Sequence, residues 1–236
     1  MKAEPLHRRG RRREMKQEGL KMTHPIAVLA GTPVDTQMGV DVLTEAGLSG
    51  TAFPLSADPR QQTAFQHSSP AEKQGRTLAV LRQAMDRGCE KALVYCNSLS
   101  AAVDFPALAR ETGMKIVTPL DIYRGLAPRY RRLAFIAANA QGLSGIERVL
   151  LAANPALDTL SAAALPVVLA IEQGQDPDQL VEAHHLAQLA DWFAACGMEA
   201  LLLGCTHFPY FKEALARRTS LPLIDPTQEM LELLQA

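Results

Sequence analysis

The chain has 236 residues, of which 47% are hydrophobic, and its 24 basic and 25 acidic side chains leave a formal net charge of −1. This is enough to bury the core of one large or two small globular domains. Glycine, proline or charge interrupts every apolar stretch well before about 18 residues, which excludes a transmembrane helix. No secretory signal is recognisable either, so we expect a cytoplasmic protein.

The first 23 residues are strongly basic, with eight Lys or Arg against three Asp or Glu. Because they are so charged and so poor in apolar side chains, residues 1–23 are predicted to be a disordered leader. Without them the net charge falls from −1 to −6, and no general basic surface remains to attract a polyanion. We therefore expect neither a nucleic acid nor a membrane as a partner.

The first half of the chain has the pattern of an α/β domain. Ile26 to Ala30 is an apolar run, broken by Gly31, Thr32 and Pro33 before a helical stretch from about 38 to 45. A polar loop over residues 58–63 leads into the helix that carries Phe65. Two further apolar runs, at 92–94 and 116–117, predict buried parallel strands.

The second half repeats this order of strand, polar loop, helix and strand. Its apolar runs lie at 133–137 and 201–203, with a helix from about 144 to 152 between them. We therefore expect two similar α/β domains related by an approximate two-fold axis, 24–118 and 119–221. A last strand at 222–225 and an amphipathic helix at 227–234 predict that residues 222–236 return to the first domain.

A duplicated pattern surrounds two of the four cysteines. Three residues of the first half recur 109 positions later: Gly88 as Gly197, Glu90 as Glu199 and Cys96 as Cys205. Each cysteine is predicted to be the last residue of its strand, at the sheet edge where open α/β folds bind ligands. Two such edges facing each other would place a thiol on either side of a small molecule. That is the geometry of a two-base proton exchange.

Hydroxyl, amide and imidazole groups follow both cysteines. Asn97 and Ser98 come after the first, and Thr206 and His207 after the second. Each site is predicted to begin a helix, whose positive end would lower the thiol pKa and hold a substrate carboxylate. A single buried cysteine is more often an inert core residue. The duplication favours the catalytic interpretation here.

The remaining candidates each have a structural alternative. His207 could assist the Cys205 thiol or serve as a satisfied structural histidine. Arg60 suits bidentate pairing with a second substrate carboxylate, and equally suits a solvated loop. Thr32, Asn139 and Ser144 are weaker candidates, because polar residues after a strand commonly cap the next helix.

No metal or cofactor is predicted. No Cys-x-x-Cys or metal-spaced histidine pair accompanies the thiols, and the adjacent His184 and His185 point to different sides of a helix. The glycines form no dinucleotide fingerprint, and no lysine has a recognisable pyridoxal phosphate setting.

Two segments carry a family resemblance. Cys96 to Ser98 with Ala101, and Gly204 to Pro209, resemble the signature segments of the aspartate/glutamate racemase superfamily. Residues 58–63 and 139–145 are similar to two of its polar loops, so the resemblance runs from about 26 to 234. Ala30 and Gly31 replace the aspartate and serine of glutamate racemases, which favours the aspartate racemase branch. Glu172 and Gln173 stand where members often carry a basic residue.

The resemblance implies two flavodoxin-like α/β domains with parallel sheets and an active site in the cleft between them. It also implies a cofactor-independent homodimer that interconverts L and D aspartate or glutamate, with Cys96 and Cys205 as paired acid and base. Cys96 would serve the D enantiomer and Cys205 the L enantiomer.

Three alternatives remain open. Hydantoin racemases and maleate isomerases share this frame and would use the same cysteines differently. A non-catalytic two-domain binder of an acidic metabolite would keep the carboxylate-binding loops without turnover. The presence of both thiols favours the racemase.

Overall fold

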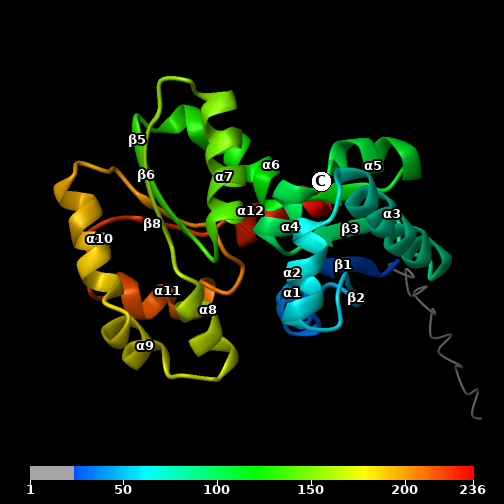
Figure 1. The fold of residues 1–236 in the computed structure, drawn as a ribbon, viewed down its shortest axis with the longest axis horizontal. Helices are drawn as coiled ribbons and strands as arrows, with labels where there is room; N and C mark the ends of the chain where they lie inside the picture. The colour runs from blue at the N-terminus through cyan, green and yellow to red at the C-terminus, as the bar shows by residue number, and fades with distance from the viewer. Residues whose placement is uncertain (1–23) are drawn as a thin grey trace, which may run out of the picture.

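The protein consists of two halves that lie side by side along its long axis (Figure 1). The computed structural model describes residues 24–236, so the predicted basic leader, 1–23, lies outside the described residues. Each half contains a four-stranded parallel sheet, with strand orders β2-β1-β3-β4 and β6-β5-β7-β8. The predicted fold class, two similar parallel α/β units, is confirmed.

The first half is built around a central strand that is buried on both faces. Its strands are β1 (Ile26–Ala30), β2 (Gly50–Pro54), β3 (Lys91–Val94) and β4 (Lys115–Val117). Its helices are α1 (Pro33–Glu45), α2 (Pro59–His67), α3 (Pro70–Asp86), α4 (Asn97–Ala102) and α5 (Phe105–Thr112). All five residues of β1 are buried, because helices cover both faces of a parallel sheet and require a continuous apolar run.

The second half follows the same plan with β5 as its central strand. Its strands are β5 (Arg132–Ala137), β6 (Asp158–Ala163), β7 (Leu201–Leu203) and β8 (Leu223–Ile224). Before β5 come α6 (Pro119–Leu126) and the 3₁₀ turn η1 (Ala127–Arg129). The other helices are α7 (Ala140–Ala153), α8 (Leu165–Glu172), α9 (Pro177–Ala183), α10 (Leu186–Ala195), α11 (Pro209–Ala216) and α12 (Thr227–Gln235).

The C-terminal segment is divided between the two halves. On α12, Met230, Leu231 and Leu234 join the apolar cluster of Ile26 and Val28 in the first half. β8 instead pairs in parallel with β7, in the second sheet. The range 222–236 assigned from the sequence to the first domain therefore needs correction, because its strand completes the second sheet and only its helix returns.

The halves meet where α4 packs against α7, at the centre of Figure 1. A Cβ atom on Gly145 of α7 would lie only 2.1 Å from the Cβ of Ala101 on α4, so this close approach requires glycine. Gly204 is constrained similarly, because its Cβ would lie 2.7 Å from the carbonyl oxygen of Ile136 on β5. Glycine before Cys205 thus lets the loop after β7 pass close to the central strand.

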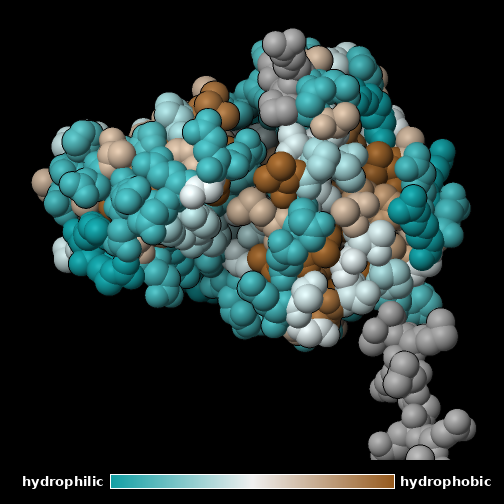
Figure 2. Space-filling view, turned by 90° about the horizontal axis from the view of Figure 1, so that it is seen from below, coloured by the Kyte–Doolittle hydropathy of each residue, from teal (hydrophilic) through white to brown (hydrophobic). Residues whose placement is uncertain are grey.

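The outer surface is mixed in polarity. Figure 2 shows a mostly hydrophilic face over the second half, with more apolar side chains where the halves meet and on the first half. Across residues 24–236, no helix combines the length and apolar character needed to span a bilayer.

Candidate active site

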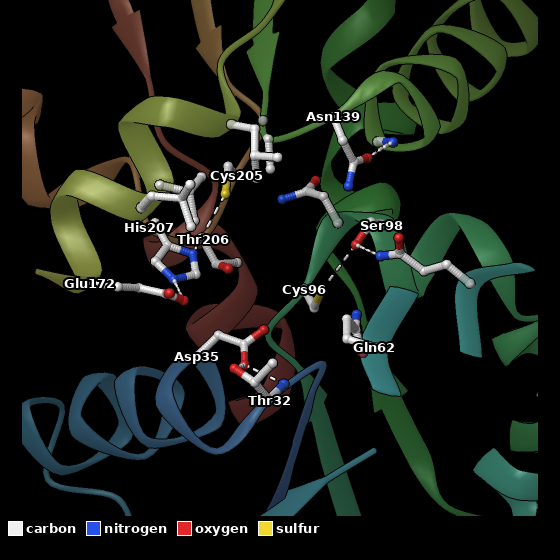
Figure 3. Close-up of a pocket in the computed structure, with 18 residues that line it drawn as sticks. Thr32, Asp35, Gln62, Cys96, Ser98, Asn139, Glu172, Cys205, Thr206 and His207 are labelled. Carbon is white, nitrogen blue, oxygen red and sulfur yellow. Dashed lines mark hydrogen bonds and ion pairs between the residues drawn. The ribbon is translucent and has the colours of Figure 1, made fainter. Parts of the chain in front are cut away.

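A cavity of about 190 Å³ lies between the two halves and contains both duplicated cysteines (Figure 3). This volume suits a small metabolite, because sites for drug-sized ligands occupy about 300–1,000 Å³. The sequence-predicted residues that line it are Thr32, Cys96, Asn97, Ser98, Asn139, Cys205, Thr206 and His207. They come from the carboxyl ends of both sheets, where the strands deliver their loops.

The other two predicted residues are placed differently. Ser144 lies on α7 and lines a separate hollow next to this cavity. Arg60 lies in the first turn of α2, which extends through most of the predicted polar loop. Its side chain is outside the described part of the structure.

Both cysteines lie slightly beyond the positions predicted for them. β3 ends at Val94 and β7 at Leu203, so each thiol follows its strand by two residues instead of ending it. Cys96 is the N-cap residue of α4, as expected, but Cys205 is followed by a turn and α11 begins only at Pro209. The helix predicted after the second site therefore begins four residues beyond the thiol.

The expected lowering of the thiol pKa values is wrong. Burial raises the pKa of Cys96 to about 11, and the nearby Asp35 carboxylate adds to the effect. Burial likewise raises the pKa of Cys205 to about 12, although the backbone N–H of His207 acts in the opposite direction. The free energy lost by removing a thiolate from water is larger here than the stabilisation that nearby hydrogen-bond donors provide. Both groups are therefore thiols in the ligand-free site at neutral pH.

A neutral chain of contacts extends from the first thiol. The Cys96 Sγ lies 3.5 Å from the Ser98 Oγ, and the Gln66 Nε2 of α2 donates a hydrogen bond to the same oxygen at 3.1 Å. Serine and glutamine have no charge to exchange at neutral pH. We call Cys96, Ser98 and Gln66 the neutral relay.

The second thiol has the equivalent contacts made by ionisable groups. The Cys205 Sγ lies 3.7 Å from His207 Nδ1, and His207 Nε2 lies 3.3 Å from a Glu172 carboxylate oxygen of α8, without an aligned hydrogen bond. Figure 3 shows this order of side chains. In both relays the first partner lies two residues after the cysteine. The second partner comes from the helix that follows an edge strand, α2 after β2 in the neutral relay and α8 after β6 here. We call these three residues the ionisable relay.

Asp35 is a site residue that sequence reasoning missed. Its carboxylate is buried and accepts hydrogen bonds from the N–H of Gly31 at 3.0 Å and from the N–H and hydroxyl of Thr32 at 2.5 and 2.6 Å. These bonds form a capping box at the start of α1. The spacing Thr32-x-x-Asp35 predicts such a cap, but only the fold places the carboxylate on the cavity wall.

Asn97 presents an unpaired donor at the cavity. Its side-chain oxygen accepts a hydrogen bond from the hydroxyl of Tyr123 at 2.8 Å, which fixes the orientation of the amide. Its Nδ2 has no partner although the residue is only 4% exposed. A buried donor without a partner is costly, and a ligand carboxylate at this wall would satisfy it.

Thr32 and Asn139 combine the two roles proposed for them. Asn139 caps α7 by accepting a hydrogen bond from the N–H of Gly142 at 2.9 Å, and Thr32 caps α1. Both also line the cavity. Capping and ligand contact are therefore compatible at these positions.

The remaining lining residues set the polarity of the cavity. α8 supplies an apolar wall of Leu165, Val168 and Leu169. Asp35 and Glu172 contribute two carboxylates, and none of the described lining residues is Lys or Arg. Within residues 24–236, no three His, Cys, Asp or Glu side chains are grouped to hold a metal ion.

Comparisons with known proteins identify the family of this chain. The sequence model of the Asp/Glu/Hydantoin racemase family matches residues 54–234. The chain belongs to this family. Solved structures with the same fold include a glutamate racemase from Francisella tularensis in complex with D-glutamate (TM-score 0.69, 21% identity, 90% of this chain and 80% of that one). An aspartate racemase homologue from Pyrococcus horikoshii has a TM-score of 0.63 at 13% identity, covering 89% and 99% of the two chains.

Curated racemases match part of the chain. A glutamate racemase from Limosilactobacillus reuteri is 24% identical over 174 residues, which is 71% of this chain and 64% of that protein. One from Thermus thermophilus is 31% identical over 153 residues, 60% of this chain and 55% of that protein. The match thus spans less than two thirds of either relative.

Proposed function

We propose that the protein is a cofactor-independent amino-acid racemase that interconverts the L and D forms of aspartate or glutamate. Cys96 and Cys205 exchange the Cα proton from opposite faces of the substrate. The observation that supports this most strongly is the pair of buried thiols, supplied by equivalent loops of the two halves to one small cavity. Family membership supports it independently.

The cavity has complementary groups for both charges of an amino acid. The free Nδ2 of Asn97 and the hydroxyls of Ser98 and Thr206 can donate to the α-carboxylate. Asp35 and Glu172 supply negative charge for the α-ammonium group. As the Cα proton leaves, the carboxylate gains charge, and donors already in place stabilise it without reorganisation.

Substrate binding also changes the thiols. In the empty site burial and the Asp35 carboxylate disfavour a thiolate. The ammonium group brings a cation into this acidic cavity, which offsets the carboxylate and favours ionisation of one sulfur. The other must stay a thiol, because it donates the proton to the opposite face.

The difference between the two relays supports a particular starting state. His207 accepts the proton of Cys205, and Glu172 stabilises the resulting imidazolium, whereas the neutral relay offers no charged acceptor and makes Cys96 the less readily ionised thiol. Cys205 then removes the Cα proton of one enantiomer and Cys96 donates its own to the other face. The products are a Cys205 thiol and a Cys96 thiolate, the state that the reverse reaction requires.

The side chain of the substrate is the open part of the proposal. The curated relatives above are glutamate racemases, which favours glutamate, whereas Ala30 and Gly31 in place of aspartate and serine favour aspartate. Arg60, in the first turn of α2, is proposed to pair with the distal carboxylate. Arg60→Ala should then raise KM for a dicarboxylic substrate and leave kcat nearly unchanged.

Proton NMR in D2O tests the proposal without a prior choice of substrate. Purified protein is incubated with a panel of L-amino acids, and loss of the Cα proton signal marks exchange. Aspartate or glutamate should lose its signal while the others keep theirs. Retention of every Cα signal by folded protein would reject the racemase. Light scattering tests the homodimer that we propose alongside it.

A further inference from the structure

A second hollow of about 350 Å³ lies next to the cavity, between α3 of the first half and α7 of the second. The side chains that matter for its chemistry are Gln66, Lys73, Ser98, Gln141, Ser144 and Arg148. Gln66 and Ser98, both members of the neutral relay, line the cavity and this hollow alike. We call it the basic hollow.

The two neighbouring spaces have opposite charge. The cavity is lined by Asp35 and Glu172, whereas the basic hollow is lined by Lys73 and Arg148 and by no acidic residue among those described. Two like charges facing one space repel each other and attract an anion. Ser144 lies one turn before Arg148 on the same face of α7 and adds a hydroxyl.

Both cations are held in place yet retain free donors. The Lys73 ammonium donates to the carbonyl oxygen of Gln66 at 3.3 Å, and an Arg148 Nη2 donates to the carbonyl oxygen of Ala101 at 3.2 Å. An ammonium group has three N–H donors and a guanidinium five, so these bonds leave most of them available. A side chain already ordered by the fold loses less entropy when it binds a ligand.

We propose that the basic hollow binds an anionic group, a carboxylate or a phosphate, between Lys73 and Arg148. Such a ligand would connect the two halves beside the cavity. It would also contact the neutral relay, because Gln66 holds Lys73 through its carbonyl and Ser98 through its amide. The anion belongs either to the substrate or to a separate effector.

Binding of inorganic phosphate tests the site without turnover, so its failure is distinguishable from failure of the racemase proposal. Titration calorimetry should show phosphate binding to the full-length protein. In K73Q/R148Q the phosphate affinity should fall about a hundredfold or more, because both cations that hold the anion are lost. Arg82→Gln is the matched control, since it removes a cation of α3 that pairs with Glu111 outside the hollow. The phosphate affinity of Arg82→Gln should equal that of the wild type.

A milder variant guards against misfolding. Arg148→Lys keeps the charge and loses the planar fork, so it should weaken phosphate binding less than K73Q/R148Q does. The proposal is overturned if wild-type protein binds no phosphate at tens of millimolar, or if folded K73Q/R148Q binds it as tightly as Arg82→Gln.

Kinetics then identify the source of the anion. If the hollow takes the distal acid of the substrate, phosphate should raise KM without changing kcat, and K73Q/R148Q should raise KM similarly. If it takes an effector, phosphate should change kcat through the neutral relay, and K73Q/R148Q should abolish that response while substrate KM stays the same. Either pattern supports the anion site.

Discussion

The two thiols occupy equivalent places in the two halves, but their surroundings differ in one chemical respect. Cys96 contacts serine and then glutamine, whereas Cys205 contacts histidine and then glutamate. The backbone duplication brings the sulfurs to one cavity, and the relays make them unequal. Proton exchange between two faces needs that inequality, because two thiols or two thiolates together would be inactive.

Replacing either thiol gives the largest expected effect. In Cys96→Ser and Cys205→Ser, racemization should fall by about 10³-fold or more in both directions, since the proposed mechanism needs both thiols as acid and base. A substrate with a leaving group on its β-carbon needs only deprotonation before elimination. Each variant should therefore still eliminate from one enantiomer, and the two should choose opposite ones. By family resemblance, Cys205→Ser would retain the D enantiomer.

Circular dichroism must first show that both variants are folded. The two-thiol mechanism is refuted if both eliminate from the same enantiomer, or if either racemizes at the wild-type rate.

Asp35→Asn tests a residue that both thiols share. Loss of the carboxylate proposed to face the substrate ammonium group should lower kcat/KM by about 10- to 100-fold, as expected for a hydrogen bond to a charged group. Asp121→Asn is a matched control, because Asp121 forms the same capping box with Thr118 on α6 and does not line the cavity. Both variants should lose similar stability, and only the first should lose activity. Equal activities would restrict Asp35 to helix capping.

Changing the first partner of each thiol isolates the difference between the relays. The equilibrium constant of racemization is 1, because enantiomers have equal free energies, so kcat/KM must be equal in the two directions. The effect on each thiol is therefore measured as elimination from each enantiomer separately. His207→Asn should slow elimination from the enantiomer that Cys205 deprotonates by about tenfold or more, because the proton acceptor is lost. Ser98→Ala should slow elimination from the other enantiomer by only a few-fold. Equal losses on both enantiomers would show that the relays do not differ in function.

The last prediction leaves activity aside and concerns stability at alkaline pH. The folded-state pKa values of about 11 and 12 lie above the unfolded value of 9.0, so the folded state retains protons that the unfolded state releases. The stabilisation is complete below pH 9 and is lost as pH rises toward 11 and 12. Urea unfolding of Cys205→Ser should show a shallower decline between pH 9 and 11 than wild type. An identical decline would contradict burial as the cause.

Much of the frame could be predicted because it depends on local patterns. The apolar runs at β1 and β5 and the spacing of Cys96 and Cys205 are visible in the sequence. The sequence pattern does not predict β2 and β6, because GTAFP and DTLSAA contain no run of adjacent large aliphatic residues, unlike the other two edge strands, β4 and β8.

The chemistry of the site was harder to predict because it depends on tertiary structure. Gln66, Glu172 and Asp35 come from helices whose sequences carry no catalytic motif, and only the packing of α2, α8 and α1 brings them to the cavity. The thiol pKa values were predicted with the wrong sign for the same reason. A helix start can be recognised from sequence, whereas the exclusion of water from the Cys96 thiol depends on residues that only the fold brings together.

The return of α12 to the first half also constrains the order in which the two halves can fold. Met230 and Leu234 belong to the same apolar cluster as Ile26 and Val28, so a helix that follows the whole second half in sequence completes a core that begins before it. Domains generally fold as units from the N-terminus during translation. Here the first half stays open on its α12 side until translation has passed β8, which also completes the second sheet.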